Sequence, residues 1–300
     1  MPHPAAALPL HLLHQAPFTV KEARAAGIGR SRLRAIDLQR PTWGVRRTAL
    51  AEPGFLDAVQ AFACALPEDC VFSHDTAARL HGLPTPRMWQ PDEPIHVIRN
   101  SNRPKITRNA CSGHRGLERR EVVTVAGVPA TTMLHTWLDL GQWGVFSLVA
   151  VADAMLNRMP GLDATDLVDA CEGRAGQRGY PTLLQAAGLA RRGAASPQES
   201  TARVWFHTWG LPEPELNRDL FDETGEWVAR PDFTWQRERV VAEYDGDQHR
   251  TRRSTWEYER ERRAIVEDLG WTYVEMSART LTRPAVRERL RLRLQSLLMP

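Results

Sequence analysis

Three acidic residues in the last third of the chain have the types and spacing of a metal site. In the stretch RPDFTWQRERVVAEYDGDQHR (230–250), Asp232 follows a proline, and Glu243 and Asp245 stand two residues apart at the end of an apolar run. Carboxylates at strand ends supply the hard oxygen ligands that Mg²⁺ prefers and that Mn²⁺ also accepts. An ion held there would polarise a phosphoryl oxygen and generate hydroxide. The chemistry indicated is hydrolysis of phosphodiester bonds.

The strand that carries two of these acids must also align them. Side chains alternate along a β-strand, so Glu243 and Asp245 are expected to share one face of VVAEYDG with Val241. Asp232, on the preceding strand, is expected to meet Glu243 across the pair. The alternative is an exposed strand end with solvated acids, but three acids on buried strands would need compensation. A fourth acid, Asp247, is interpreted as a turn residue.

The basic group of such a site, commonly a lysine two residues after the second acid, is missing. Asp245 occupies that position, and residues 193–300 contain no lysine. His249 can act as an acid or a base near pH 7. Arginine can clamp a phosphate but is a poor base, and the following helix offers three, with Arg262 the preferred candidate besides Arg260 and Arg263. The same arginines would equally suit a solvated helix face. We expect a rearranged site rather than an inactive one, because the acids are retained.

The elements around these residues are expected in the order helix, three strands, helix, strand, helix. That order, together with S..E…GLP.P..N…RPDF…VVAEYDGDQH…ER.RR….LGW…M, resembles the PD-(D/E)xK restriction-endonuclease-like fold. It resembles more closely a branch related to the very-short-patch mismatch-repair endonucleases. The resemblance implies an αβββαβ core over residues 193–300 and metal-dependent DNA cleavage in its ancestry, although a fold alone does not establish present activity.

The resemblance also implies a further metal ligand, Glu199, on the first helix of this region. The sequence offers a second interpretation for the same residue. Ser196 and Pro197 begin a helix, and Glu199 then stands at the third helical position, where a capping box requires it. Both roles stay open at this stage.

The first fifty residues carry the net positive charge of the chain. They hold eight Lys/Arg against two Asp/Glu, or +6, whereas residues 51–192 sum to −1 and residues 193–300 to −2. FTVKEARAAGIGRSRLRAI predicts two short helices around a glycine turn, with a capping box from Thr19 to Glu22. QRPTWGVRR predicts a wing. Helix, turn, helix and wing suit DNA binding, and the expected contacts come from the second helix, about Arg30 to Ile36, and from the wing: Arg30, Arg32, Arg34, Arg46 and Arg47. The alternative is a small helical domain with a solvated basic face.

Residues 51–192 are expected to form an α+β middle domain without a catalytic constellation. PIHVIRN and REVVTVAGVPATT predict strands, the second a hairpin around Ala126-Gly127, and MLHTWLDLGQ and FSLVAVADAMLNR predict buried helices. His74 and His81 could be ligands, but two histidines without a third partner favour a structural role. EGRAGQRGYPT and LARRGAASPQ predict a loop and a linker, with a domain boundary near residue 193.

The first 192 residues resemble AbiEi-type antitoxins, which are transcriptional autorepressors. The winged-helix pattern and SH.TAA..HGLP…HV…TTMLHTWLDL carry this resemblance. It implies DNA as a partner, and beyond it a cognate toxin or a second copy of the chain. The fold class expected is therefore mixed α/β in three domains: a winged helix (1–50), an α+β middle domain (51–192) and a restriction-endonuclease-like domain (193–300).

Composition excludes several classes of protein. The 300 residues are 42% hydrophobic and 25% charged, which is typical of folded domains and not of disordered chains. No apolar run reaches the ~20 residues of a membrane span, and the first residues lack the basic start of a signal peptide. Four cysteines without CxxC spacing fit a reducing cytoplasm and give no cysteine metal site. The leading hypothesis is a cytoplasmic DNA-binding protein with a Mg²⁺-dependent endonuclease domain. The alternatives are a non-enzymatic antitoxin-like regulator with a degenerate nuclease fold, and an RNA-directed nuclease.

Overall fold

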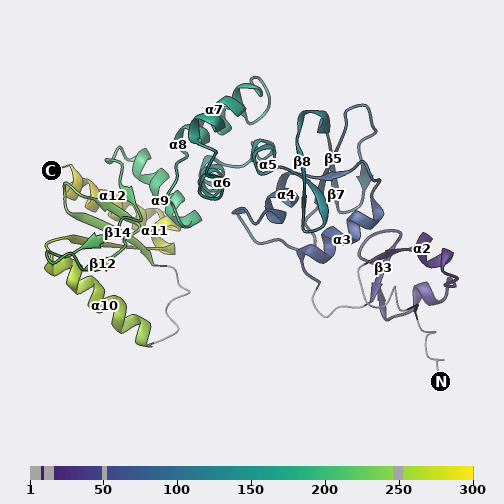
Figure 1. Cartoon of the computed structure of the whole chain (residues 1–300), viewed down its shortest axis with the longest axis horizontal. Helices are drawn as coiled ribbons and strands as arrows, with labels where there is room; N and C mark the ends of the chain where they lie inside the picture. The colour runs from purple at the N-terminus through teal and green to yellow at the C-terminus, as the bar shows by residue number, and fades with distance from the viewer. Residues whose placement is uncertain (1–7, 10–16, 49–52, 246–252, 300) are drawn as a thin grey trace. The chain divides into compact units, whose positions relative to one another are not determined.

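The computed structural model describes residues 8–9, 17–48, 53–245 and 253–299. Its helices and several sheets confirm the mixed α/β class (Figure 1). The chain divides into two compact units, residues 1–140 and 141–300. The expected domain boundary near residue 193 lies inside the second unit, where residues 141–192 pack with the elements that follow them.

The N-terminal region forms a small three-stranded fold with its own core. Strands β1 (Phe18–Thr19), β2 (Leu38–Gln39) and β3 (Val45–Thr48) pair in the order β1-β3-β2 beside helix α2 (Val20–Ala25). The predicted capping box is confirmed, because the Thr19 side chain accepts from the Glu22 N–H and the Glu22 carboxylate accepts from the Thr19 N–H. The buried apolar residues of this core are Leu8, Phe18, Ala23, Leu33 and Leu38.

The predicted second helix over 30–36 is wrong. The structure has a single 3₁₀ turn, η1 (Arg32–Arg34), and the backbone is already extended at Ala35. A segment of seven residues gains too few hydrogen bonds to offset the cost of nucleating a helix, so tertiary contacts decide its conformation. Here Leu33 is the one buried residue of the turn. The helical turn of this segment is thus shorter than the helix that the sequence predicts.

The rest of the first unit is a six-stranded sheet with helices α3 (Phe55–Ala65), α4 (His74–Leu80) and α5 (Met133–Asp139). The strand order is β6-β7-β5-β4-β9-β8. Their bounds are β4 Val71–Phe72, β5 Ile95–Arg99, β6 Thr107–Arg108, β7 Cys111–Arg115, β8 Val122–Val125 and β9 Val128–Thr131. The predicted hairpin is confirmed, with positive φ at Ala126 (49°) and Gly127 (79°), as a two-residue I′ turn requires. A second 3₁₀ turn, η2, spans Leu117–Arg119.

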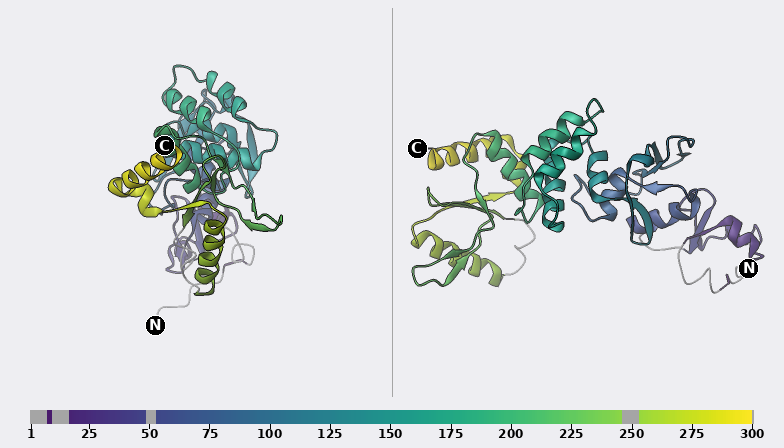
Figure 2. Two further views of the ribbon diagram at one scale, coloured as in Figure 1. Left: turned by 90° about the vertical axis from the view of Figure 1, so that its left-hand side faces the viewer. Right: turned by 45° about the horizontal axis from the view of Figure 1, so that its top comes forward.

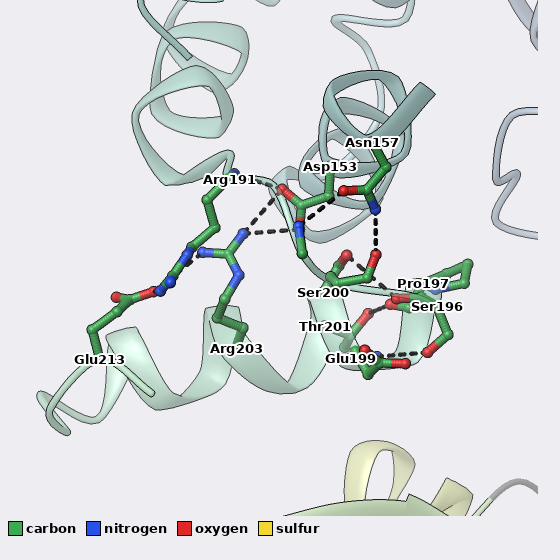
Figure 3. A network of polar contacts seen from close by, with 12 residues as sticks. Asp153, Asn157, Arg191, Ser196, Pro197, Glu199, Ser200, Thr201, Arg203 and Glu213 are labelled. Atoms are coloured by element: carbon green, nitrogen blue, oxygen red, sulfur yellow. Dashed lines mark hydrogen bonds and ion pairs between the residues drawn. The ribbon is translucent and has the colours of Figure 1, made fainter. Parts of the chain in front are cut away.

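The second unit begins with helices that belong to the C-terminal fold. They are α6 (Val145–Arg158), α7 (Ala164–Glu172), α8 (Tyr180–Leu189) and α9 (Pro197–Thr208). Asp153 of α6 accepts hydrogen bonds from the Arg203 guanidinium at 2.9 and 3.1 Å, and both side chains are at most 3% exposed (Figure 3). This buried ion pair joins α6 to α9 across the expected boundary.

The segment predicted as a linker is firmly packed. The Arg191 N–H donates to Asp153 at 2.8 Å, and the Gly193 N–H donates to Asn157 at 2.9 Å. Asn157 in turn donates to the Ala194 carbonyl at 2.6 Å (Figure 3). A true linker leaves its backbone groups to water, whereas these groups are bound by side chains of α6. LARRGAASPQ is rich in small residues and arginines, as linkers often are, but its backbone is bound to α6.

A four-stranded sheet in the order β10-β13-β14-β15 forms the centre of the C-terminal fold. Helix α10 (Arg253–Asp268) covers one face, and α9 and α12 (Pro284–Leu298) cover the other, with α11 (Ala278–Thr282) following β15 (Figures 1 and 2). Strand β14 is antiparallel to β13 and parallel to β15. The strand bounds are β10 Glu215–Leu216, β11 Leu220–Phe221, β12 Trp227–Ala229, β13 Phe233–Trp235, β14 Val240–Asp245 and β15 Thr272–Ser277.

Two of the expected strands are interrupted. PELNRDLF splits into β10 and β11 at Asn217, which has a φ of 48°. VARPDFTW splits into β12 and β13 around Pro231, which has no N–H to give to a strand ladder. Strands β11 and β12 then form a separate two-stranded hairpin. No helix in the described part of the chain is long and apolar enough to cross a bilayer.

Candidate active site

Asp232 and Glu243 lie opposite each other where β13 meets β14. Phe233 is the partner of Ala242 in this antiparallel pair, so the next step in the same register sets Asp232 against Glu243. Asp232 accepts a hydrogen bond from the Tyr244 N–H at 2.6 Å. The alternation predicted for β14 is confirmed, since Val240, Ala242 and Tyr244 pack in the core against α9 and α12, while Val241 packs in the core against α10. Glu243 therefore lies on the α10 face.

The environment of Asp232 makes its carboxyl group a weak acid. Burial, together with the charges of Glu199 and Glu243, raises its pKa to about 7, against the lowering effects of the Tyr244 N–H and Arg262. The electrostatic influence of both glutamates places three carboxyl groups in one neighbourhood. A cation that binds there gains the attraction of all three and competes with a single proton on Asp232.

One carboxylate oxygen of Glu243 accepts hydrogen bonds, and the other accepts none from the described residues. Its Oε2 accepts from the Tyr273 hydroxyl at 2.5 Å and from Arg262 Nη2 at 2.6 Å. Its Oε1 is buried and has no hydrogen-bond partner among the described residues. A buried acceptor without a partner costs about 1–3 kcal/mol, and more when it is charged. The unsatisfied oxygen fits a metal ligand.

Glu199 is held in place by hydrogen bonds at the start of α9. Its N–H donates to the Ser196 hydroxyl at 3.2 Å, which is one half of a capping box. Its own Oε2 accepts from the Ala195 N–H at 2.8 Å and from Asn217 Nδ2 at 2.9 Å. The side chain is only 5% exposed. Glu199 thus fixes the entry to α9 and the turn after β10, and it contributes negative charge to the site.

Two of the three candidate arginines of α10 point toward different partners. Arg262 of α10 makes an ion pair with Glu243, at the centre of the site. Arg263 turns away to Glu267 at 3.0 Å and Glu275 at 3.6 Å, and lies over the Tyr273 ring at 4.9 Å. Arg260 is exposed on the same helix. Of the three, Arg262 is the one that reaches the acids.

The remaining acidic and basic candidates of this stretch are Asp245, Asp247 and His249. Asp245 ends β14 opposite Ser277 of β15, on the same strand face as Glu243. His249, predicted as an acid or base, lies outside the described residues, as does the turn residue Asp247. Among the described residues, the carboxylates of this site do not form a group of three with ligand atoms within 4.8 Å of one another. Mg²⁺ commonly uses one or two carboxylates and keeps several waters.

Sequence reasoning missed two contributors to this site. Tyr273 of β15 pairs in register with Val241 and extends its hydroxyl to Glu243. Asn217 connects Glu199 to the strand of Asp232, since its N–H donates to the Asp232 carbonyl at 3.1 Å. The GLP.P..N spacing contained Asn217, but nothing in it indicated a hydrogen bond to a helix 18 residues earlier.

The five arginines predicted to bind DNA divide into two groups. Arg30 and Arg34 are exposed around η1. Arg32 instead holds Asp37 through two hydrogen bonds of 2.7 and 2.8 Å. The wing arginines also turn inward: Arg46 donates to the carbonyls of Leu33 and Val45, and Arg47, 7% exposed, donates to Gln39 at 2.9 Å and lies 3.7 Å from Asp57. Three of the five therefore make contacts within the N-terminal fold, and two are exposed.

The raised pKa of Asp232 predicts a pH-dependent affinity for divalent ions. Binding requires the carboxylate, so with a pKa of about 7 the Mn²⁺ affinity should be about tenfold weaker at pH 6 than at pH 8 and should level off above pH 8. The expected measurement is isothermal titration of Mn²⁺ into the full chain at both pH values. Equal affinities at pH 6 and pH 8 would show that Asp232 does not titrate with metal binding.

The raised pKa of Asp232 also predicts how the stability of the metal-free protein depends on pH. The folded pKa of Asp232, about 7, exceeds the unfolded value of about 3.9. Its contribution to stability is therefore fully present below pH 4 and is lost as the pH rises through 7. Urea unfolding of wild type and Asp232→Asn should diverge with rising pH, the variant becoming the more stable of the two.

No family model matches the chain. It is similar to two uncharacterized proteins of Mycobacterium tuberculosis, one from strain CDC 1551 / Oshkosh and one from strain ATCC 25618 / H37Rv. Each is 28% identical to this chain over 228 residues, which cover 75% of this chain and 81% of the relative. The function therefore has to be argued from the geometry and charge of the sites.

Proposed function

We propose that the protein binds DNA and hydrolyses its phosphodiester bonds with a Mg²⁺ ion held by Asp232 and Glu243. The observation that carries the proposal is the unsatisfied, buried Oε1 of Glu243 opposite an Asp232 whose pKa is raised to about 7. The arrangement of α9, β13, β14, α10 and β15 supports a restriction-endonuclease-like domain. Residues 141–192, bound to α9 through Asp153, are part of the same compact unit.

The residues of the site have separate tasks in this proposal. The bound ion would supply the positive charge at the phosphoryl group and the acidity of a bound water. Asp232 and Glu243 supply the ligands, and the Tyr273 hydroxyl orients the Glu243 carboxylate through its Oε2. Glu199 adds negative charge that strengthens cation binding, and it is itself held by Asn217. None of these tasks needs a lysine two residues after Glu243.

The role of Arg262 distinguishes two candidate functions. As a phosphate clamp, it would leave Glu243 when DNA and metal arrive and would stabilise the charge of the transferring phosphoryl group. As a permanent partner of Glu243, it would replace the metal and leave a nuclease fold that only binds DNA, as in an antitoxin-like regulator with a cognate toxin. The 2.6 Å ion pair with Glu243 is the specific observation that favours this second candidate.

Substitution of Arg262 separates the two functions. In the nuclease, Arg262→Ala should lower the rate of Mg²⁺-dependent plasmid cleavage by about 10²-fold, and Arg262→Lys should restore it poorly because lysine lacks the planar fork. In the regulator, Arg262→Ala should free Glu243, strengthen Mn²⁺ binding and leave cleavage undetectable. Arg263→Ala, on the same helix but directed at Glu267 and Glu275, is the matched control.

The two exposed arginines of the winged region should carry its DNA affinity. Each phosphate contact contributes about 0.9 to the slope of log affinity against log salt, so Arg30→Ala with Arg34→Ala should reduce the slope by about 1.8. Arg32→Ala is the matched control, because Arg32 is bound to Asp37 and should leave the slope nearly unchanged. Fluorescence anisotropy with duplex DNA at several salt concentrations measures both. Equal slopes for the double variant and wild type would remove these two residues from the interface.

A further inference from the structure

The first unit brings together three histidines that are far apart in the sequence. His96 lies on β5 and His114 on β7, two parallel neighbouring strands, and His74 begins α4 after β4. Neighbours on β5 pack with α3 in the core on one face of the sheet, so His96 faces the other side. One ring nitrogen from each of the three lies within 4.8 Å of the other two, and no other His, Cys, Asp or Glu group in the described chain meets that condition.

The spacing of the ring nitrogens fits one tetrahedral ion. His96 Nδ1 and His114 Nε2 are 3.1 Å apart. Two nitrogens bound at about 2.0–2.1 Å to a tetrahedral Zn²⁺ lie about 3.3 Å apart. The rings are nearly parallel, at 14° between His96 and His114 and 16° between His74 and His114. Coordination therefore requires the rings to turn so that one nitrogen of each faces the ion.

Ser73 and Asp139 lie beside one ring nitrogen of His74 and orient the ring. Its Nδ1 lies 3.0 Å from the Ser73 hydroxyl and 3.9 Å from Asp139 Oδ2. The Asp139 side chain is fully buried and accepts three hydrogen bonds from Arg120, at 2.6, 2.9 and 3.1 Å. A carboxylate behind the far nitrogen of a histidine is the usual support of a metal-bound imidazole. That support leaves Nε2 of His74 as the ligand atom.

Two further observations agree with a ligand role for the cluster. His74 has a φ of 50°, a conformation that costs a non-glycine residue of order 1–3 kcal/mol and that concentrates at functional sites. Burial lowers the pKa of all three histidines, to about 3 for His74 and about 4 for His114, so their rings are neutral at physiological pH. Neutral imidazole is the form that binds metal. The His74 side chain is 18% exposed, so water can reach the site and supply a fourth ligand.

We propose that His74, His96 and His114 form a three-histidine site for a divalent transition-metal ion of the zinc type. Imidazole ligands favour Zn²⁺ and Co²⁺, whereas the two carboxylates of the C-terminal unit favour Mg²⁺. The ion would tie β5, β7 and the start of α4 together and would present an open coordination position to solvent. This site does not depend on the nuclease proposal, because it lies in the other compact unit.

Titration of Co²⁺ into the metal-stripped full chain tests the proposal, in an Asp232→Asn background that removes the carboxylate site. We expect one Co²⁺ per chain with the visible absorption of a tetrahedral nitrogen site, displaced by Zn²⁺. His96→Gln and His114→Gln should each weaken binding by about 100-fold or more. His207→Gln, an exposed histidine of α9, should bind as the parent does. Unchanged binding in both cluster variants would overturn the proposal.

X-ray absorption on the Zn²⁺-loaded Asp232→Asn protein gives a readout that does not rely on the folding of histidine variants. Three imidazole nitrogens at about 2.0–2.1 Å are expected. A first shell of oxygen atoms only, or no stoichiometric zinc, would contradict the site even if the nuclease proposal holds. The histidine site would likewise stand if Asp232 were shown to bind no metal.

Discussion

Asp232→Asn is expected to lower the rate of Mg²⁺-dependent DNA cleavage by about 10³-fold, which corresponds to roughly 4 kcal/mol of transition-state stabilisation. The substitution keeps an oxygen that can accept from the Tyr244 N–H, so the turn before β13 is preserved. It removes the charge that binds the ion, because a neutral amide oxygen is a weaker ligand than a carboxylate. Conversion of supercoiled plasmid to nicked and linear forms at pH 8 measures the rate.

Glu223→Gln is the matched control for this prediction. Glu223 is an exposed acid in the turn between β11 and β12, and its substitution removes the same charge from the same unit. The control should cleave at the wild-type rate. If wild type and Asp232→Asn were equally inactive on supercoiled, linear and single-stranded DNA and on RNA, the protein would be a binding protein, and the regulator would replace the nuclease. Cleavage of RNA alone would identify an RNA-directed enzyme.

Asp153→Ala is expected to destabilise the second unit by roughly 3–5 kcal/mol. Arg203 is 3% exposed and its Nη2 donates twice to Asp153, so the variant leaves a buried guanidinium without its counter-charge. The Arg191 N–H loses its acceptor in the same step. Since whole domains are stable by only about 5–15 kcal/mol, this loss is a large fraction of the total. Urea denaturation measures the free energy, and hydrogen exchange of α6 and α9 localises it.

Two further variants show whether the buried pair causes this effect. Glu213→Ala removes the other acid near Arg203, at 3.7 Å, but Glu213 is half exposed, so the cost should stay below about 1 kcal/mol. Replacing both Asp153 and Arg203 with apolar residues of similar size should recover most of the stability, because no buried charge then remains. Equal stabilities for Asp153→Ala and wild type would mean that the pair does not anchor α6 to α9.

Local patterns predicted the alternation of side chains along β14. Alternation along VVAEYDG fixed the face of Glu243, and the proline before Asp232 marked the start of the partner strand. These inferences succeed because side-chain direction in a strand follows directly from residue parity. The hairpin at Ala126-Gly127 was predicted for a similar reason, since a two-residue I′ turn requires positive φ at both positions and glycine adopts it readily.

Features that depend on distant contacts were not predictable in the same way. His96 and His114 are 18 residues apart and meet only because β5 and β7 are parallel neighbours, which no local pattern specifies. The expected linker carried the composition of a loop, yet Asp153 and Asn157 of α6 bind its backbone. Arg46 and Arg47, which the sequence predicts as DNA contacts, donate to groups within the fold, and the sequence did not indicate these partners. In each case a partner remote in sequence decides the outcome.

Anomalous diffraction from crystals of the full chain soaked in Mn²⁺ at pH 8 tests the central claim most directly. The account predicts a peak coordinated by one carboxylate oxygen of Asp232 and by Oε1 of Glu243, at about 2.0–2.3 Å, with water completing the shell. The Arg262 guanidinium should then contact only Oε2 of Glu243 or leave it. An Asp232–Glu243 pair that stays free of manganese, with Arg262 still bound to Glu243 as in the present structure, would contradict the account.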